Sequence, residues 1–313
     1  MKSLHSNKPW LALAAGTAVV GTLPWLVSEF VASVLLSCLM YIALATSWSL
    51  FCGATRYLSL ATSAFFGIGA YASATLLGSL PWPLVIVAGA LIATVVAVVM
   101  GAAVLHLRGT YFAVLTFGMT ELIRHAVTFV EKQVSGTVGR VLTVVPNNET
   151  VYLTVLLIAA GAIATAIAVK RSRFGLALSG IGADEQRAQT LGVDTRLAKI
   201  AGFGITAAFA GAVGAAMAVR WTYIEPAAVF SPFIGFQTVL IALIGGAASI
   251  GGPVLAAIVF SLLAETLRLQ LPYGYMMVLG LLLILCVMYL PNGLATLWQR
   301  KRAATPAVEA GHV

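Results

Sequence analysis

The chain has 313 residues, of which only 28 are charged (18 basic and 10 acidic), while 60% are hydrophobic. Its mean hydropathy is +1.00. Because charged residues make up about a quarter of a typical soluble domain, this composition excludes a soluble, disordered or disulfide-stapled protein and indicates an all-α polytopic membrane protein. The net charge of +8 is then assigned to cytoplasmic loops and anionic lipid headgroups rather than to nucleic-acid binding.

Apolar runs that could cross a bilayer recur ten times along the chain. A hydrocarbon core about 30 Å thick needs roughly 20 apolar residues of helix. The first run follows Lys2 and Lys8 like a signal peptide, but no small-x-small cleavage site follows it, so we interpret it as a transmembrane helix. The predicted helices cover residues 10–27, 30–52, 58–78, 83–105, 109–130, 151–169, 199–219, 236–249, 252–267 and 273–290.

The eighth and ninth runs are short and flank a cluster of helix-breaking residues. The cluster is Gly245, Gly246, Gly251, Gly252 and Pro253, and at such residues the backbone turns or leaves the helix. The two runs are therefore also compatible with one interrupted span or with a re-entrant hairpin buried in protein.

The placement of lysine and arginine decides between nine and ten spans, because short cytoplasmic loops carry the excess of positive charge. With ten spans and a cytoplasmic N-terminus, 13 of the 18 basic residues lie in the cytoplasm, four lie outside, and Arg124 lies within a span. Nine spans would place the basic segment 299–302 outside. The pattern predicts ten spans, both termini in the cytoplasm, and a single transmembrane domain over 1–313 with a disordered tail at 303–313.

The cytoplasmic loop 170–198 is longer than the topology requires. It mixes charges with apolar residues such as Phe174 and contains glycines at Gly180, Gly182 and Gly192. This pattern predicts one or two short amphipathic helices, broken at Gly180 and Gly182 and ended near Gly192. Helices too polar to cross the bilayer would lie on the headgroups or dock into a partner, and the alternative is a plain solvated connector.

Several segments in and around this loop resemble one protein family. Residues 172–178 read SRFGLAL, residues 184–193 read DEQRAQTLGV, and the small-residue span 200–218 follows. Together they resemble the cytoplasmic coupling region of branched-chain amino acid ABC importer permeases, and are closer to the M-type than to the H-type subunit. Further matching segments, in the same order along the chain, are residues 53–71, 107–124, 243–257 and 289–295.

The resemblance implies a multi-pass permease of a bacterial inner membrane importer for branched-chain or other hydrophobic amino acids. The expected partners are a second permease of the H type, two cytoplasmic ATPase subunits and a periplasmic substrate-binding protein. The chain has no Gly-Lys pair and hence no phosphate-binding loop. ATP and Mg²⁺ would therefore be bound by the ATPase subunits, and the chain itself would be neither an enzyme nor the holder of a cofactor.

Coupling to the ATPase is expected to use an apolar face of the loop, with Asp184, Glu185 and Arg187 making charge pairs at its rim. The residues expected to take part are Arg173, Phe174, Gly175, Asp184, Glu185, Arg187, Ala188 and Gly192.

Two groups are candidates for the translocation path. Glu121, Arg124 and His125 lie at helical spacing within one span, and such groups face either a watery cavity or a protein partner. They are thus either path-lining residues or a mutually satisfied structural pair. Gly245 and Gly246 either expose backbone to substrate in a broken helix or allow close helix packing.

Outside the membrane, Arg220 and Glu225 are candidate contacts for the binding protein, because prolines stiffen their loop. The cysteines Cys38, Cys52 and Cys286 show no C-x-x-C spacing, so no metal site is predicted.

Three alternatives remain open from the sequence. Relatives of such permeases transport amides, urea or small carboxylates, which leaves the ligand undecided. A stand-alone secondary transporter would need intramembrane carboxylates, of which Glu121 is the clear example. An intramembrane enzyme would need a recognisable site, and the chain has neither H-E-x-x-H nor G-x-S-x-G.

Overall fold

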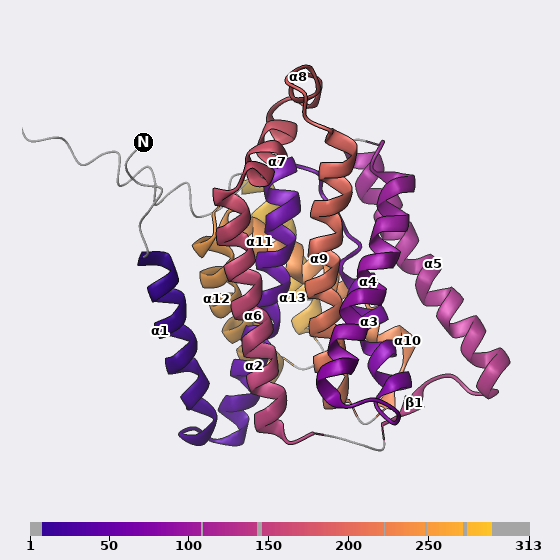
Figure 1. Ribbon diagram of the computed structural model, residues 1–313. Helices are drawn as coiled ribbons and strands as arrows, with labels where there is room; N and C mark the ends of the chain where they lie inside the picture. The colour runs from indigo at the N-terminus through magenta and orange to yellow at the C-terminus, as the bar shows by residue number, and fades with distance from the viewer. Residues whose placement is uncertain are drawn as a thin grey trace, which may run out of the picture.

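In a computed structural model of the chain, the apolar runs form helices that pack side by side (Figure 1). The structure describes residues 8–289 except 108, 143–145, 222, 248 and 272–273. The short helices α7 (Arg173–Ala183) and α8 (Glu185–Thr190) lie at one end of the bundle. At the other end, β1 (Arg140–Val141) pairs antiparallel with β2 (Tyr223–Ile224). The predicted tail 303–313 and the basic segment 299–302 lie outside the described residues.

The remaining elements follow the predicted order. They are α1 (Lys8–Thr22), η1 (Leu23–Trp25), α2 (Glu29–Trp48), the π-helical turn η2 (Ser49–Gly53), α3 (Thr62–Leu76), α4 (Trp82–Val104), α5 (Thr110–Ser135), α6 (Asn148–Arg171), α9 (Thr195–Met217), η3 (Ala218–Arg220), α10 (Pro226–Val229), α11 (Pro232–Gly245), α12 (Gly251–Gln270) and α13 (Tyr275–Tyr289).

Among the described residues, seven segments are long and apolar enough to cross a membrane. The three other predicted spans coincide with α1, α3 and α13, which have 15 residues each. The all-α polytopic class is thus confirmed, apart from the small strand pair, while ten crossings and the orientation of the termini stay predictions. The seven segments are Glu29–Gly53, Trp82–Val104, Thr110–Val134, Asn148–Arg171, Thr195–Arg220, Pro226–Gly245 and Gly251–Gln270.

The two faces of helix α4 differ in the size of their side chains. One face, which includes Gly89, Ala93 and Ala97, is buried and packs on α9. The opposite face exposes large aliphatic side chains such as Leu91 and Val95. Since the exposed face is more bulky and apolar than the buried one, small residues mark the protein side and branched residues the lipid side.

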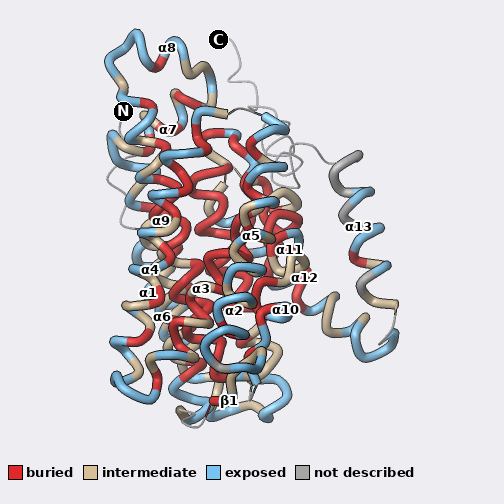
Figure 2. Tube along the Cα trace, turned by 90° about the vertical axis from the view of Figure 1, so that its right-hand side faces the viewer, coloured by how far each residue is buried: buried red, intermediate tan, exposed pale blue. Residues whose placement is uncertain are grey.

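The centre of the bundle is α9, which packs against α4, α3, α2 and α6. Figure 2 shows the buried residues gathered around α2, α3 and α9, with the outer helices largely exposed. A Cβ at Gly69 of α3 would lie 1.9 Å from the carbonyl oxygen of Gly211, and a Cβ at Gly214 would lie 2.0 Å from that of Phe66. Only glycine permits this distance between the α3 and α9 backbones.

The glycine cluster near residue 250 forms a turn between two separate helices. α11 ends at Gly245, Gly246 adopts φ 85°, and α12 begins at Gly251. A Cβ at Gly252 would lie 1.8 Å from the carbonyl oxygen of Gly245, so the two helices touch at their glycines. The geometry favours close packing of a helical hairpin over a single interrupted span.

Candidate functional site

The connection between α6 and α9 folds into two capped helices. The Ser172 hydroxyl accepts a hydrogen bond from the amide of Gly175 at the start of α7 (3.2 Å). The Asp184 carboxylate accepts bonds from the amides of Gln186 (3.0 Å) and Arg187 (3.1 Å) at the start of α8. Each cap satisfies amides that have no partner within their helix, so polar residues set where α7 and α8 begin.

The predicted helix break at Gly180 and Gly182 is wrong, because α7 continues through both glycines to Ala183. The break comes at Asp184, whose extended backbone (φ −160°, ψ 110°) and capping side chain start the next helix. The predicted stop near Gly192 is confirmed. Gly192 adopts φ 84°, and its amide donates to the carbonyl of Gln189 (2.9 Å).

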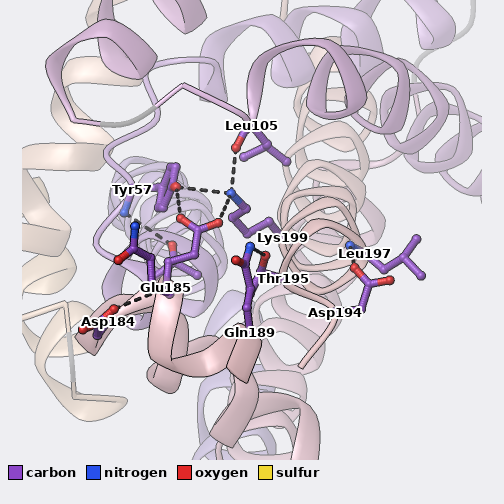
Figure 3. A network of polar contacts seen from close by, with 11 residues as sticks. Tyr57, Leu105, Asp184, Glu185, Gln189, Asp194, Thr195, Leu197 and Lys199 are labelled. Atoms are coloured by element: carbon purple, nitrogen blue, oxygen red, sulfur yellow. Dashed lines mark hydrogen bonds and ion pairs between the residues drawn. The ribbon is translucent and has the colours of Figure 1, made fainter. Parts of the chain in front are cut away.

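A buried ion pair fixes α8 to the bundle. Lys199 Nζ lies 2.7 Å from Glu185 Oε1, and the two side chains are 5% and 8% exposed. Tyr57 donates its hydroxyl hydrogen to Glu185 Oε2 (2.7 Å), and Lys199 donates to the carbonyl oxygen of Leu105 (2.7 Å). Figure 3 shows Tyr57 and Lys199 both directed at the Glu185 carboxylate. The network joins α8, α9, the segment before α3 and the end of α4.

This arrangement gives Glu185 a different role from the predicted one. Its carboxylate is engaged inside the chain rather than exposed at a rim, and its part in coupling to an ATPase stays a prediction. Asp184 also acts within the chain, as a cap and as a partner of Arg187 (3.0 Å). Ala188 and Gly175 are buried and hold α7 and α8 in place rather than forming an exposed face.

The exposed residues of α7, α8 and the turn after α8 include two leucines and two arginines among neutral polar residues. Leu176 is 75% exposed and Leu191 is 84% exposed, while the Arg187 side chain is 85% exposed. Arg173 and Gly192 are also exposed, and Phe174 is half-buried. The outward side of the loop thus includes the five exposed residues Arg173, Leu176, Arg187, Leu191 and Gly192, whereas Glu185 faces the bundle.

Two glycines let α7 lie directly on the bundle. A Cβ at Gly182 would lie 2.1 Å from the carbonyl oxygen of Ala54, and a Cβ at Gly175 would lie 2.1 Å from that of Val169. Gly180, on the same helix, has nothing closer than the Ala188 Cβ at 3.9 Å.

We expect Gly182→Ala to lift α7 from the π-helical turn of α2 and to destabilise the protein by about 1–3 kcal/mol. Gly180→Ala is the matched control and is expected to leave stability unchanged or raise it by up to about 1 kcal/mol, because alanine favours helix. Thermal unfolding of the purified chain in detergent measures both. Equal melting temperatures for the two variants would contradict the close contact at Ala54.

A second buried carboxylate lies at the opposite end of the bundle. Glu131 Oε2 accepts hydrogen bonds from the Tyr71 hydroxyl (2.9 Å) and the Gly139 amide (3.0 Å). Arg140 Nε lies 3.3 Å from Glu131 Oε1. These bonds fix the end of α5 to α3 and to β1.

The two predicted binding-protein contacts lie near this end. Arg220 donates to the Ser33 hydroxyl (2.7 Å), so its guanidinium is already held by α2. Glu225 is exposed immediately before α10. Arg220 is exposed as well, so both residues stay predicted contacts for the binding protein.

The predicted translocation residues lie on different elements. On α5, Arg124 Nη2 lies 2.5 Å from Glu121 Oε2, and His125 Nε2 lies 3.9 Å from the same oxygen. α5 stands away from the bundle on the side opposite α1 (Figure 1). Gly245 and Gly246 instead form the turn after α11. The Glu121–Arg124 contact agrees with the structural-pair interpretation, and a path-lining role stays a prediction.

Sequence reasoning missed the partners of both carboxylates. The charge count places Lys199 among the 13 cytoplasmic basic residues, at the first position of the span predicted over 199–219, whereas Lys199 lies in the second turn of α9 and is buried. Its neighbours Ala198 and Ile200 are apolar and could have indicated that Lys199 lies within the helix rather than before it. Tyr57 and Tyr71 lie 128 and 60 residues from their carboxylates, and no local pattern points to them.

The family of this chain follows from its similarity to known proteins. Residues 30–288 match the model of the branched-chain amino acid transport system / permease component family. The chain belongs to this family. The match runs from α2 into α13 and includes both carboxylate networks and the loop helices α7 and α8.

Two curated relatives support the family membership of this permease. It is 26% identical to the high-affinity branched-chain amino acid transport system permease protein LivM of Escherichia coli, over 92% of this chain and 75% of the relative. It is 25% identical to the protein of the same name from Salmonella typhimurium, with the same coverage. No solved structure matches the chain. The permease is a multi-pass membrane protein of the LivM-like type and a member of an ABC transporter complex.

Proposed function

We propose that this chain is the M-type permease subunit of a binding-protein-dependent importer in the bacterial inner membrane. It carries branched-chain or other hydrophobic amino acids inward, using ATP hydrolysed by separate subunits. The observation that carries the proposal is the family match over 30–288 together with a docking loop anchored to the bundle by a buried ion pair. Ten spans with both termini in the cytoplasm would place this loop on the ATPase side.

The loop is suited to transmit motion rather than to perform chemistry. Its outward face of Leu176 and Leu191 would enter a groove on an ATPase subunit, with Arg173 and Arg187 at the rim. Its inward side is held by the Glu185–Lys199 pair and by the capped helix ends. Because packed helices move as bodies, a displacement of α7 and α8 by the ATPase would carry α9 with it.

The remaining subunits supply what this chain lacks. Two ATPase subunits would bind ATP and Mg²⁺, an H-type permease would complete the translocation path, and a periplasmic binding protein would deliver the ligand and set its identity. Glu225, exposed at the opposite end from α8, is the proposed contact for that binding protein. The same architecture would serve amides, urea or small carboxylates with another binding protein.

The ATPase interface is tested by placing a charge on the outward face. We expect Leu176→Asp with Leu191→Asp to abolish co-purification of the ATPase subunits from cells that express the whole complex. Both side chains are exposed in the chain, so its own folding is expected to stay unchanged. Ala227→Asp is the control, since it adds a charge to an exposed site at the other end.

Two results would contradict the proposal. One is normal co-purification with the double variant. The other is uptake by the purified chain alone under an ion gradient, which would favour a stand-alone secondary transporter instead. Uptake by reconstituted complex with candidate binding proteins then identifies the ligand.

A further inference from the structure

The surroundings of helix α5 do not match its composition. Among the seven segments of the described residues that could cross a membrane, the one formed by α5 is the least hydrophobic and also the least buried. It stands away from the bundle in Figure 1, and its main contacts are with α3, α4 and α10. Because contact with lipid favours hydrophobic residues, lipid alone does not explain the exposed side of α5.

The two sides of α5 are distinct. The inner side packs on the bundle through Phe112, Thr116 and Thr120, whose exposed fractions are at most 1%. The outer side is exposed along the helix. Four of its residues, at helical spacing, define what we call the outer face of α5: Gly118, Leu122, His125 and Phe129.

Ionisable groups lie near the middle of this span, Thr110–Val134. Glu121 pairs with Arg124, and their side chains are 25% and 28% exposed. The His125 side chain is 72% exposed. Ionisable groups at this depth face protein or a water-filled cavity rather than lipid, so the cover for His125 has to come from outside the chain.

The residues beside His125 favour protein over water as the cover. Leu122 and Phe129 are each 64% exposed, and a water-filled path would leave both of these large apolar side chains in water. Interfaces between membrane helices combine small residues, which allow close approach, with polar residues that hydrogen-bond across the interface. Gly118 has nothing within 4 Å of a Cβ position, so packing within the chain does not require a glycine there.

Charge distinguishes a different subunit from a second copy of this chain. In a two-fold dimer the same surface of both copies meets itself, so His125 would lie near another His125 at the same depth. The nearest carboxylate, that of Glu121, is already paired with Arg124. A different subunit can instead place a carboxylate, a hydroxyl or an amide opposite the imidazole.

We propose that the outer face of α5 packs against a transmembrane helix of a second, non-identical permease subunit. That helix approaches closely at Gly118 and presents a hydrogen-bonding side chain to His125. The proposal rests on the proposed function, which requires a second permease, and it assigns the surface of this chain to which that subunit binds.

The test is photo-crosslinking in cells that express the whole complex. p-Benzoylphenylalanine replaces Phe129 in one variant and Val95, on the lipid side of α4, in the other. The two side chains are 64% and 62% exposed, which makes Val95 the matched control. The probe at position 129 is expected to form a covalent adduct with the second permease, and the probe at position 95 is expected to form none.

Two results of the crosslinking would contradict the proposal. An adduct with another copy of this chain would overturn the assignment to a different subunit. The absence of a protein adduct at position 129, or equal adducts at both positions, would overturn the interface itself.

Substitutions on the outer face test the same contact without a probe. Gly118→Leu is expected to remove the second permease from the purified complex, whereas Ala102→Leu, at an exposed site of α4, is expected to retain it. His125→Leu is expected to lower retention about threefold to tenfold, from the loss of one hydrogen bond between helices, and His125→Gln to restore much of it. The melting temperature of the purified chain is expected to stay unchanged in all four variants, because these sites are exposed.

The composition of the parent complex separates this proposal from the proposed function. A purified complex without any second permease would contradict the importer assignment. A complex that contains one, but in which the probe at position 129 forms no adduct with it and Gly118→Leu does not release it, would contradict the assignment of the α5 surface alone.

Discussion

Lys199→Met is expected to destabilise the protein by about 3–5 kcal/mol and to remove most transport by the complex. Methionine keeps the length of the side chain but leaves the Glu185 carboxylate buried without its cationic partner, and breaking one side of a buried pair costs this much. It also removes the hydrogen bond to the Leu105 carbonyl oxygen. Thermal unfolding of the chain in detergent and uptake by reconstituted complex measure the two effects.

Two further variants make this experiment specific. Glu185→Gln combined with Lys199→Met removes both charges and keeps a group that accepts from the Tyr57 hydroxyl, so it is expected to recover much of the lost stability. Arg187→Met breaks the exposed pair with Asp184 and is expected to cost less than about 1 kcal/mol. Similar losses for Lys199→Met and Arg187→Met would show that the buried network does not hold α8.

Gly214→Ala and Gly69→Ala are each expected to destabilise the bundle by about 3 kcal/mol. The added methyl groups would lie 2.0 Å from the Phe66 carbonyl oxygen and 1.9 Å from that of Gly211, so α3 and α9 would have to separate along their whole contact. Melting temperature and the yield of folded protein after detergent extraction are the measurements.

Gly118→Ala is the control for this pair of glycines. Gly118 lies in the interior of α5 and has nothing within 4 Å of a Cβ position. Alanine there is expected to be neutral or to stabilise the helix by up to about 1 kcal/mol. Destabilisation by Gly118→Ala as large as that by Gly214→Ala would mean that the close contact between the α3 and α9 backbones is not the reason for the loss at Gly214.

The positions of the helices could be predicted from the sequence because lipid permits few alternatives. Each apolar run must satisfy its own backbone hydrogen bonds, and helices do so. The helix ends were less predictable. α9 begins at Thr195 because the Asp194 carboxylate accepts a hydrogen bond from the amide of Leu197 (3.0 Å). α5 continues past the predicted end at residue 130 to Ser135, because the Glu131 carboxylate is paired with Arg140 inside the fold.

The helices of the loop between α6 and α9 could be predicted from the sequence, but the contacts that hold them could not. Capping residues and a stop glycine are local signals, so a helical loop between α6 and α9 was predictable. The partners of Glu185 were not, because Tyr57 and Lys199 meet its carboxylate only after the segment before α3, α8 and α9 have packed. A charged residue such as Glu185 gives the same sequence signal whether it faces a partner subunit or its own bundle.

Helix α3 and the segment that precedes it place one tyrosine at each of the two carboxylates. Tyr57, five residues before α3, binds Glu185, and Tyr71, within α3, binds Glu131. A 15-residue helix is about 22 Å long and stiff along its axis. An axial displacement of α3 would therefore strain the hydrogen bonds at the loop helices and at the strand pair together, so the two ends of the bundle are mechanically linked through one short helix.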